Sequence, residues 1–388
     1  MSASSTAPRA WALRAFGLAA ALALAACAGG PIASVGGPAE TVNVALLVPS
    51  GSGQASDDLI AQNLENAARM AISDLDGVKV NLQVYPTGAG DTQAAQSASQ
   101  ALAAGAQIIL GPVFAASANA AGQAVAGRGV NVLAFSNNPA VAGGNVFILG
   151  QTFADTADRL VRYAVSQGKT SFAIVHDQTT AGQIGEQAAY AAVQAAGGTV
   201  AEDFGYPYSQ QGVSDALPGI AKQVKASNAQ AVIFTADTAG ALPLVTQLMS
   251  ENGVDPAVTQ YIGLTRWDIP PTTLALPGVQ HGWFALPDPG LSQQFNARYQ
   301  AAYGSAPLPI ASLAYDGIAA IGALAKHAGA GAFSAAALTQ PAGFVGVNGI
   351  FRFRPDGTTQ RGLAIAQIVN NQVSVIDPAP RSFGGPGS

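Results

Sequence analysis

The sequence predicts an α/β protein built from two doubly wound parallel sheets, and three observations point to this fold class. Short apolar runs alternate with longer stretches whose apolar residues recur at helical spacing, from Val42 onward. The alternation pauses at residues 143–153 and then restarts with similar numbers of strands and helices. Roughly 360 residues remain after the N-terminal leader, more than one hydrophobic core usually serves, so two domains are expected.

The first half contains four expected strands, and a helix is expected after each of the first three. Residues 42–48 are typical of a buried strand, and Leu59, Asn63, Ala67 and Met70 share one face of the helix expected over 59–75. The other strands are expected at 78–85, 106–110 and 131–135, and the other helices at 92–104 and 116–126. Right-handed crossovers then favour a parallel sheet with helices on both faces.

The same alternation resumes after the pause and predicts a second doubly wound domain. The expected helices are 154–167, 183–196, 213–226 and 239–251, and the expected strands are 171–175, 199–204, 231–235 and 260–264. The similar order of elements suggests duplication of the architecture, although no repeat is visible residue by residue.

The last quarter of the chain is expected to serve both domains. It contains expected helices at 295–303 and 310–328, and antiparallel strands at 349–353, 363–369 and 372–376 joined by Asp-Gly and Asn-Asn turns. We assign residues 41–150 plus about 278–342 to lobe 1, 151–277 plus about 343–377 to lobe 2, and 378–388 to a flexible tail. This path crosses between the lobes three times. Ligands bind beyond the carboxyl ends of parallel strands, so two such edges predict an interlobe cleft.

The N-terminus reads as an export signal. Arg9 and Arg14 precede an apolar run over residues 15–26, too short for the roughly 20 residues of a membrane span. Residues 1–26 are therefore expected to be a signal peptide. Cys27, the single cysteine of the chain, follows at once, and residues 27–40 have the Gly, Pro, Ala and Ser composition of a flexible tether.

Residues 24–27 resemble a bacterial lipobox, which implies lipidation of Cys27 and anchoring at a membrane through the lipid only. The alternative is ordinary cleavage after the Ala-Ala pair, with an incidental cysteine. Ala28, in place of an aspartate, resembles the outer-membrane address of Gram-negative lipoproteins facing the periplasm. With no second cysteine, the chain forms no internal disulfide.

The composition and the motifs argue against several functions. Charged residues make up 10% of the chain and its formal charge is −5, so no basic patch for nucleic acid is expected. His176, His281 and His327 have no metal-ligand spacing, so neither a metal nor a cofactor is expected. There is no nucleophile elbow, P-loop or zinc-protease motif. The chain is thus expected not to be an enzyme.

Candidate ligand-binding residues follow the expected strand ends. The candidates are Ser50, Phe114, Ala115, Ser136, Asn137, Asn138, Asp177, Thr180, Asp237, Trp267 and Asp268. Trp267 could stack on a ligand as an exposed indole or pack between the lobes. The Ser136–Asn138 triplet could bind a ligand or cap a turn. Asp177 with Thr180 could bind an ammonium group or cap the next helix, and Asp237 is open to the same two interpretations.

One resemblance concerns the loop after the third strand. Residues 108–112, Ile-Ile-Leu-Gly-Pro, followed by a helix rich in Ala and Ser, are similar to the ligand loop of leucine/isoleucine/valine-type binding proteins, which have the type I periplasmic binding protein fold. Those proteins generally place a serine after this Gly-Pro, where this chain has Phe114 and Ala115, and a tyrosine where it has Ala181. Weak or no binding of leucine, isoleucine and valine is therefore expected.

A second resemblance spans residues 42–376. The chain resembles the penicillin-binding protein activator lipoproteins in the segments 133–138, 263–268, 314–316, 346–353 and 361–363. This resemblance implies a non-catalytic regulator of a peptidoglycan synthase, with a penicillin-binding protein as partner. The alternative is the substrate-binding lipoprotein of an ABC transporter for amino acids or related small polar solutes, with an ABC permease as partner and a small polar ligand in the cleft.

Overall fold

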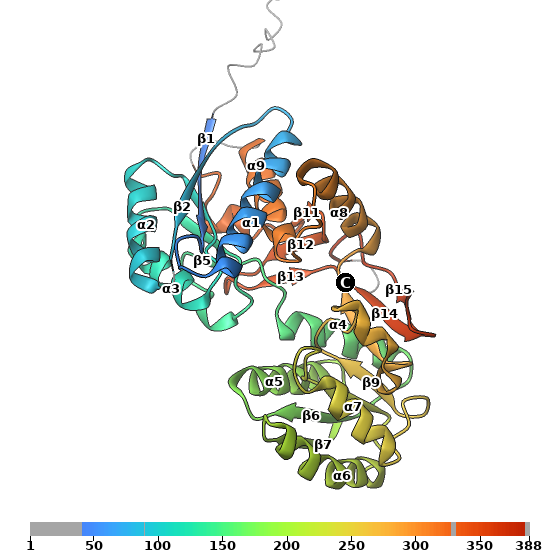
Figure 1. Cartoon of the computed structure of the whole chain (residues 1–388). Helices are drawn as coiled ribbons and strands as arrows, with labels where there is room; N and C mark the ends of the chain where they lie inside the picture. The colour runs from blue at the N-terminus through green and yellow to red at the C-terminus, as the bar shows by residue number, and fades with distance from the viewer. Residues whose placement is uncertain (1–40, 89, 327–330, 385–388) are drawn as a thin grey trace, which may run out of the picture. The chain divides into compact units, whose positions relative to one another are not determined.

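The computed structural model describes residues 41–88, 90–326 and 331–384, and its first half forms a five-stranded parallel sheet (Figure 1). The strands are β1 (Thr41–Val48), β2 (Lys79–Pro86), β3 (Ile108–Leu110), β4 (Asn131–Ala134) and β5 (Val146–Ile148), in the order β2-β1-β3-β4-β5. Successive side chains of β1 point to opposite faces. Val44 and Leu46 therefore join one core and Ala45 and Leu47 another.

Helices cover both faces of this first sheet. The helices α1 (Ala55–Ser73) and α9 (Ala311–Lys326) pack together over one face, and α2 (Asp91–Ala103) and α3 (Ala115–Ala124) pack together over the other. Many of the buried helical residues are alanines, such as Ala67 and Ala98. The small side chains let the helices approach the sheet closely.

The second sheet has seven strands. Five are parallel: β6 (Ser171–Asp177), β7 (Thr199–Tyr206), β8 (Ala231–Phe234), β9 (Gln260–Gly263) and β10 (Trp283–Leu286). The antiparallel strands β14 (Ala364–Val369) and β15 (Gln372–Asp377) extend it to the order β15-β14-β10-β9-β8-β6-β7. The helices α4 (Phe153–Ser166) and α5 (Thr180–Ala195) pack on one face, and α6 (Gln210–Ala226) and α7 (Leu242–Glu251) on the other.

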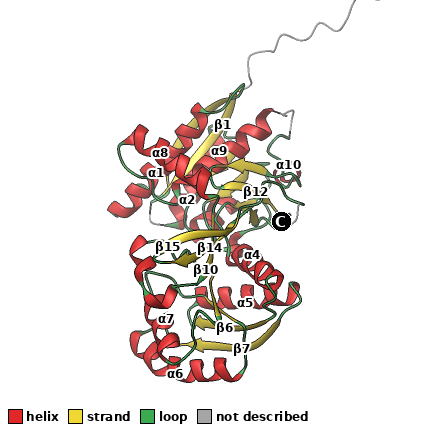
Figure 2. Ribbon diagram, turned by 90° about the vertical axis from the view of Figure 1, so that its right-hand side faces the viewer, coloured by secondary structure: helices red, strands yellow, loops and turns green. Residues whose placement is uncertain are grey.

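A small antiparallel sheet belongs to the core of the first sheet. It consists of β11 (Phe344–Gly346), β12 (Gly349–Phe353) and β13 (Thr359–Arg361), and follows α8 (Pro289–Tyr303) and the short α10 (Ala335–Leu338). Phe353 meets Phe147 of β5 edge to face, with ring centroids 5.6 Å apart. Figure 2 shows β12 beside the first sheet, and β14 and β15 with the second.

The expected α/β architecture with two parallel-sheet halves and three crossovers is confirmed. The chain passes between the sheets at residues 149–152, 287–288 and 362–363. Two of the expected lobe boundaries differ from those in the structure. β10 pairs with β9 and β14, so the chain returns after Leu286 and not at about residue 278. Residues 344–361 pack in the first core and not in the second half, because Phe351 and Phe353 are buried there.

Some short elements escaped the sequence analysis. β5, β10, β11 and β13 have only three or four residues each, too few for a periodic pattern. The Asp356-Gly357 turn consequently joins β12 to β13, and not to the strand at 364–369.

Several expectations concern residues outside the described ranges. These are the signal peptide, Cys27 and its tether, His327 and residues 385–388. Residues 378–384 were expected to be flexible, but the structure packs part of them: Arg352 lies 4.5 Å from the ring centroid of Phe383. Among the helices that the structure describes, none has both the length and the apolarity to cross a membrane.

Candidate functional site

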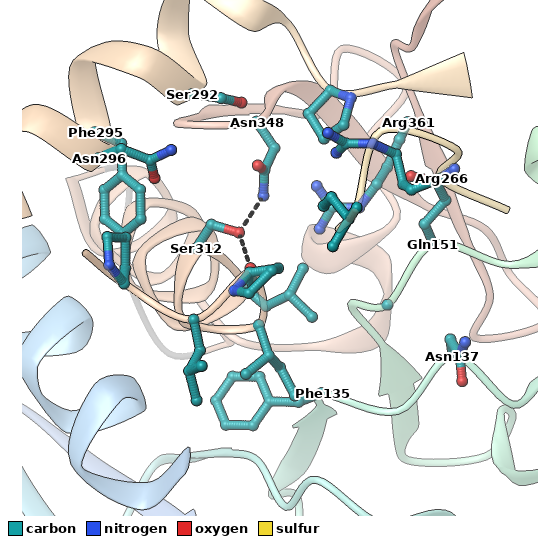
Figure 3. Close-up of a pocket in the computed structure, with 18 of the residues that line it drawn as sticks. Phe135, Asn137, Gln151, Arg266, Ser292, Phe295, Asn296, Ser312, Asn348 and Arg361 are labelled. Atoms are coloured by element: carbon teal, nitrogen blue, oxygen red, sulfur yellow. Dashed lines mark hydrogen bonds between the residues drawn. The ribbon is translucent and has the colours of Figure 1, made fainter. Parts of the chain in front are cut away.

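A pocket of about 520 Å³ lies where the connections between the two sheets meet (Figure 3). Small-molecule sites commonly have volumes of about 300–1,000 Å³. The apolar lining is Val113, Phe135, Gly150, Ile269, Pro287, Phe295, Pro307, Leu308, Pro309, Ile310, Leu313 and Leu363. The polar lining is Ser136, Asn137, Gln151, Arg266, Ser292, Asn296, Ser312, Asn348 and Arg361. The size and the mixed lining both suit a small amphipathic molecule.

The fold brings this lining together from distant parts of the sequence. Ser136 and Asn137 come shortly after β4, and Arg266 shortly after β9, so both sheets contribute from the carboxyl end of a strand. Gln151 comes from the first connection between the sheets, and Asn296 from α8. This is the position where open α/β sheets bind ligands.

A buried ion pair holds one wall of the pocket, which Arg361 lines. The guanidinium of Arg361 and the carboxylate of Asp316 are 2.8 Å apart, with side-chain exposures of 4% and 0%. Arg361 Nε and Nη2 also donate to the carbonyl of Leu149, at 3.0 and 2.7 Å. The amide of Asn348 donates to Asp316 and to the Ser312 hydroxyl. The network ties α9, β13 and the first connection together, so this wall is fixed before any ligand arrives.

Asp155 lies beside the same network. Its carboxylate accepts a hydrogen bond from the backbone N–H of Arg361 at 3.0 Å. Burial raises the pKa of Asp155 to about 7, although the Arg361 hydrogen bond and the charges of Arg354 and Arg361 act to lower it. Arg361 therefore lies next to a carboxyl group that stays protonated to a pH well above the usual range for an aspartate.

The second arginine of the lining, Arg266, forms a more exposed ion pair. Arg266 donates through Nε and Nη2 to the two oxygens of Asp268, at 2.6 and 2.5 Å. Its side chain is 32% exposed and lines the pocket, whereas Asp268 does not line it. Arg266 Nη1 donates to no group in the described parts of the chain. The guanidinium thus keeps hydrogen-bond donors for a bound molecule.

The Ser292 hydroxyl oxygen is buried, and no hydrogen-bond partner for it exists among the described residues. A buried polar atom without a partner has a free-energy cost that a ligand or an ordered water can relieve. Ser292 lies on the pocket lining, and Figure 3 shows it beside Asn348.

Of the residues expected from the sequence, Ser136 and Asn137 line the pocket. Ser136 also accepts a hydrogen bond from the Asn138 N–H at 3.1 Å. Asn138 accepts one from Ala140 N–H at 3.0 Å, and so caps the short helix over Pro139–Val141. The triplet therefore combines both interpretations, turn capping and exposure to the pocket.

Trp267 is not available to a ligand, and the expectation of an exposed indole is wrong. Its side chain is fully buried in the core between the second sheet and α6 and α7. A Cβ atom on Gly263 or Gly282 would lie 2.1 or 2.2 Å from the indole, so the two glycines make the space that it fills. The alternative of interlobe packing is also wrong, because the indole packs within one core.

The remaining candidates lie outside this pocket. Asp177 accepts hydrogen bonds from the backbone and hydroxyl of Thr179, whose hydroxyl caps α5, while Thr180 is the first residue of that helix. The carbonyl of Asp237 accepts from Leu242 N–H at the start of α7. Ser50 follows β1, and Phe114 and Ala115 begin α3. Thr179 is thus the N-cap of α5, and Asp177 contributes to the cap only through its hydrogen bonds to Thr179.

Several polar residues of the pocket and of its buried network were not among the candidates expected from the sequence. Arg361, Asp316 and Asn348 stood in segments quoted for a family resemblance, but not as candidates. Arg266 comes three residues after the end of β9 and directly precedes Trp267, so the rule that selected Trp267 would also have found it. Throughout residues 41–88, 90–326 and 331–384 there is no group of three or more His, Cys, Asp or Glu side chains placed to hold a metal ion.

A family model described as periplasmic binding protein matches residues 41–372, most of the chain. The chain belongs to this family. Its members are typically exported, non-catalytic proteins that bind ligands. A search of the curated proteins finds no significant match.

Several solved structures have the same fold. A putative branched-chain amino acid ABC transporter protein from Rhodospirillum rubrum has a TM-score of 0.73 and 19% identity, covering 87% of this chain and 100% of that one. A substrate-binding protein from Desulfitobacterium hafniense in complex with Leu has a TM-score of 0.65, 19% identity and the same coverage.

A solute-binding protein from Rhodopseudomonas palustris BisB5, in complex with 3,4-dihydroxy benzoic acid, has a TM-score of 0.60 and 18% identity, covering 90% and 99%. These likenesses establish the fold of this chain and leave its ligand to be argued from its own residues.

Proposed function

We propose that this protein is the solute receptor of an ABC uptake system, and that the 520 Å³ pocket is its ligand site. The observation that carries the proposal is the pocket itself, which is lined from strand ends of both sheets and has one wall fixed by a buried ion pair. The comparisons support the proposal, since the similar structures named above belong to ABC transporters or solute receptors. An ABC permease is the partner that this function requires.

Native mass spectrometry of protein purified from the periplasm tests the proposal. We expect a small molecule to be retained by the wild type and lost from Asn137→Trp, because Asn137 is exposed on the pocket lining and the indole would fill the space. Asn119→Trp is the matched control, because Asn119 is exposed on α3 outside the pocket. Equal retention by both variants, or a wild type that retains nothing and is stabilised by no compound in a broad solute screen, would contradict the proposal.

A second candidate function is regulation of a peptidoglycan synthase by contact with a penicillin-binding protein. The observation that favours it is the set of segments similar to the activator lipoproteins. Asp316, Asn348 and Arg361 from those segments form the buried network described above, so they support a shared architecture at least as strongly as a shared partner. Glycan polymerisation by the cognate synthase, with and without the soluble protein, distinguishes the two functions: unchanged rates favour the solute receptor.

We propose that the protein is held at the outer membrane by a lipid on Cys27. The support is the lipobox-like segment 24–27 and the absence of any other cysteine from the sequence. Cys27→Ser is expected to move the protein from the membrane pellet to the soluble fraction, because the mature chain is acidic and one acyl-bearing residue supplies the anchor. The measurement is fractionation after a salt wash. Persistence of the variant in washed membranes would show another anchor.

A further inference from the structure

The charged side chains that line the pocket are all cationic. Two arginines line it, Arg266 and Arg361, and none of its described lining residues is an aspartate or a glutamate. The other polar groups are neutral hydroxyls and amides, including the unpartnered hydroxyl of Ser292. Figure 3 shows both arginines on one side of the pocket, across from Phe295 and Asn296. Each arginine is paired with a carboxylate that does not line the pocket, so this side presents cationic hydrogen-bond donors, and no anionic acceptor among the described residues, to a bound molecule.

The carboxylates that pair with these two arginines are already occupied. Asp268 accepts from Arg266 through both oxygens, and Asp316 accepts from Arg361, Asn348 and the Val347 N–H. Neither lines the pocket. An ammonium group entering this pocket would lose water without meeting a carboxylate, and an unpaired buried charge costs several kcal/mol.

Arg266 is the group best placed to hold an acid. Among the residues that the structure describes, none accepts a hydrogen bond from its Nη1. Its hydrogen bonds from Nε and Nη2 to Asp268 fix the plane of the guanidinium. Charge-assisted hydrogen bonds from arginine to a carboxylate are short and strong. Arg361 is a weaker candidate, because its guanidinium donates to Asp316 and twice to the Leu149 carbonyl.

Apolar side chains account for more than half of the lining. Phe135 and Phe295 are almost fully buried, and Leu308 and Ile310 stand on the segment that leads into α9. Burial of apolar ligand surface on these side chains supplies affinity without any charge. We infer that the pocket selects organic monocarboxylates with an aromatic or branched apolar body and no ammonium group, with Arg266 as the specificity-determining residue. This inference rests on the proposed solute-receptor function.

Pairs of acids that differ only in the amino group provide the test. The probes are phenylpropanoate against phenylalanine, and isocaproate against leucine, titrated calorimetrically into the complete mature protein. We expect each deaminated acid to bind at least about tenfold more tightly than its amino acid, which corresponds to about 1.4 kcal/mol. Arg266→Gln should reduce affinity for the acids by roughly tenfold or more, since a hydrogen bond to a charged group is lost.

Two further variants separate binding from folding. Arg298→Gln is the matched control. Arg298 is also paired with a carboxylate, since its Nη2 donates to both oxygens of Asp74 at 2.7 Å, but it lies outside this pocket, so the exchange should leave affinity unchanged. Asp268→Asn keeps Arg266 and removes the competing charge, so affinity for the acids should be retained or rise. If Arg266→Gln and Asp268→Asn both lose binding of the acids, the Arg266–Asp268 pair has a purely structural role. That result would overturn the inference.

The remaining outcomes are equally decisive. Amino acids that bind as tightly as their deaminated partners overturn the inference but leave the solute receptor standing. If Asp177→Asn or Asp237→Asn then abolishes that binding, the ammonium group is held at the strand ends of the second sheet. If none of the four probes binds, the inference also falls, whereas a small molecule still retained in native mass spectra keeps the proposed function.

Discussion

At the scale of single residues, Arg361 connects three separate parts of the molecule through hydrogen bonds. Its guanidinium bonds to α9 through Asp316 and to the first connection through Leu149, while its backbone N–H bonds to Asp155 of α4. All of these groups are buried. In such a site the loss of one partner costs more than the pair contributes, because the remaining charge stays desolvated.

We therefore expect Arg361→Met to lower the free energy of unfolding by about 3–5 kcal/mol, as measured by urea denaturation. The double variant Arg361→Met with Asp316→Asn should recover part of that loss, because the amide oxygen can still accept from Val347 N–H without carrying a charge. A single variant within about 1 kcal/mol of the wild type would show that water reaches Asp316 and pairs with it.

Asp155 gives a prediction about pH. Its pKa is raised from 3.8 to about 7, so between these values the folded protein binds a proton that the unfolded chain has released. Stability from this group is therefore complete below about pH 4 and is lost as the pH rises to about 7. Asp155→Asn keeps an acceptor for the Arg361 N–H and should remove that loss. The stability advantage of the variant over the wild type should grow across this window, by up to roughly 1.4 kcal/mol per pH unit, in denaturation series. An advantage that does not depend on pH would contradict it.

At the scale of elements, the turn after β9 shows how a core decides the fate of a side chain. Trp267 follows a strand end, and an indole there could face a ligand. Gly263 on β9 and Gly282 before β10 leave an empty volume next to it, and the indole fills that volume. Aromatic burial outweighs exposure at a strand end, because a tryptophan buries about 150–250 Å² of surface.

Gly263→Ala should consequently destabilise the protein by about 1–3 kcal/mol, since its Cβ would overlap the indole of Trp267 and overpack the core. Gly219→Ala makes the same exchange on the exposed side of α6, with no atom within 4 Å of the new Cβ. There we expect a gain of about 0.5–1 kcal/mol from helix propensity. Thermal denaturation of the two variants checks the prediction, and equal shifts would refute the packing argument.

The elements also show which features a sequence can reveal. The longer elements follow the periodic pattern: α1 and α4 end within two residues of the expected positions. Two of the missed strands, β5 and β10, have three and four residues that are all buried, so they show no alternation of apolar and polar side chains. The pocket was found only in part for a related reason. Ser136 and Asn137 follow a strand end, whereas Ser292, Asn296 and Ser312 reach the pocket from helices. Only the folded chain reveals that convergence.

At the scale of the whole molecule, each sheet has cores on both of its faces and is linked to the other by three short connections. The pocket is lined by residues of both halves, such as Ser136 and Arg266, and by the first connection through Gln151. A molecule bound there contacts both halves at once. Its binding free energy therefore stabilises the two sheets jointly and not one of them alone.

Hydrogen exchange measures this coupling directly. With phenylpropanoate at about 100 times its dissociation constant, the bound state gains about 2.7 kcal/mol against global unfolding. Amides of β4 in the first sheet and β9 in the second should both exchange more slowly, since exchange of core strands reports the most global openings. Asn137→Trp, with its pocket filled, should show no such ligand-dependent change in either strand. Slowing confined to β4 would mean that the ligand contacts the first half only, and that Arg266 does not take part in binding.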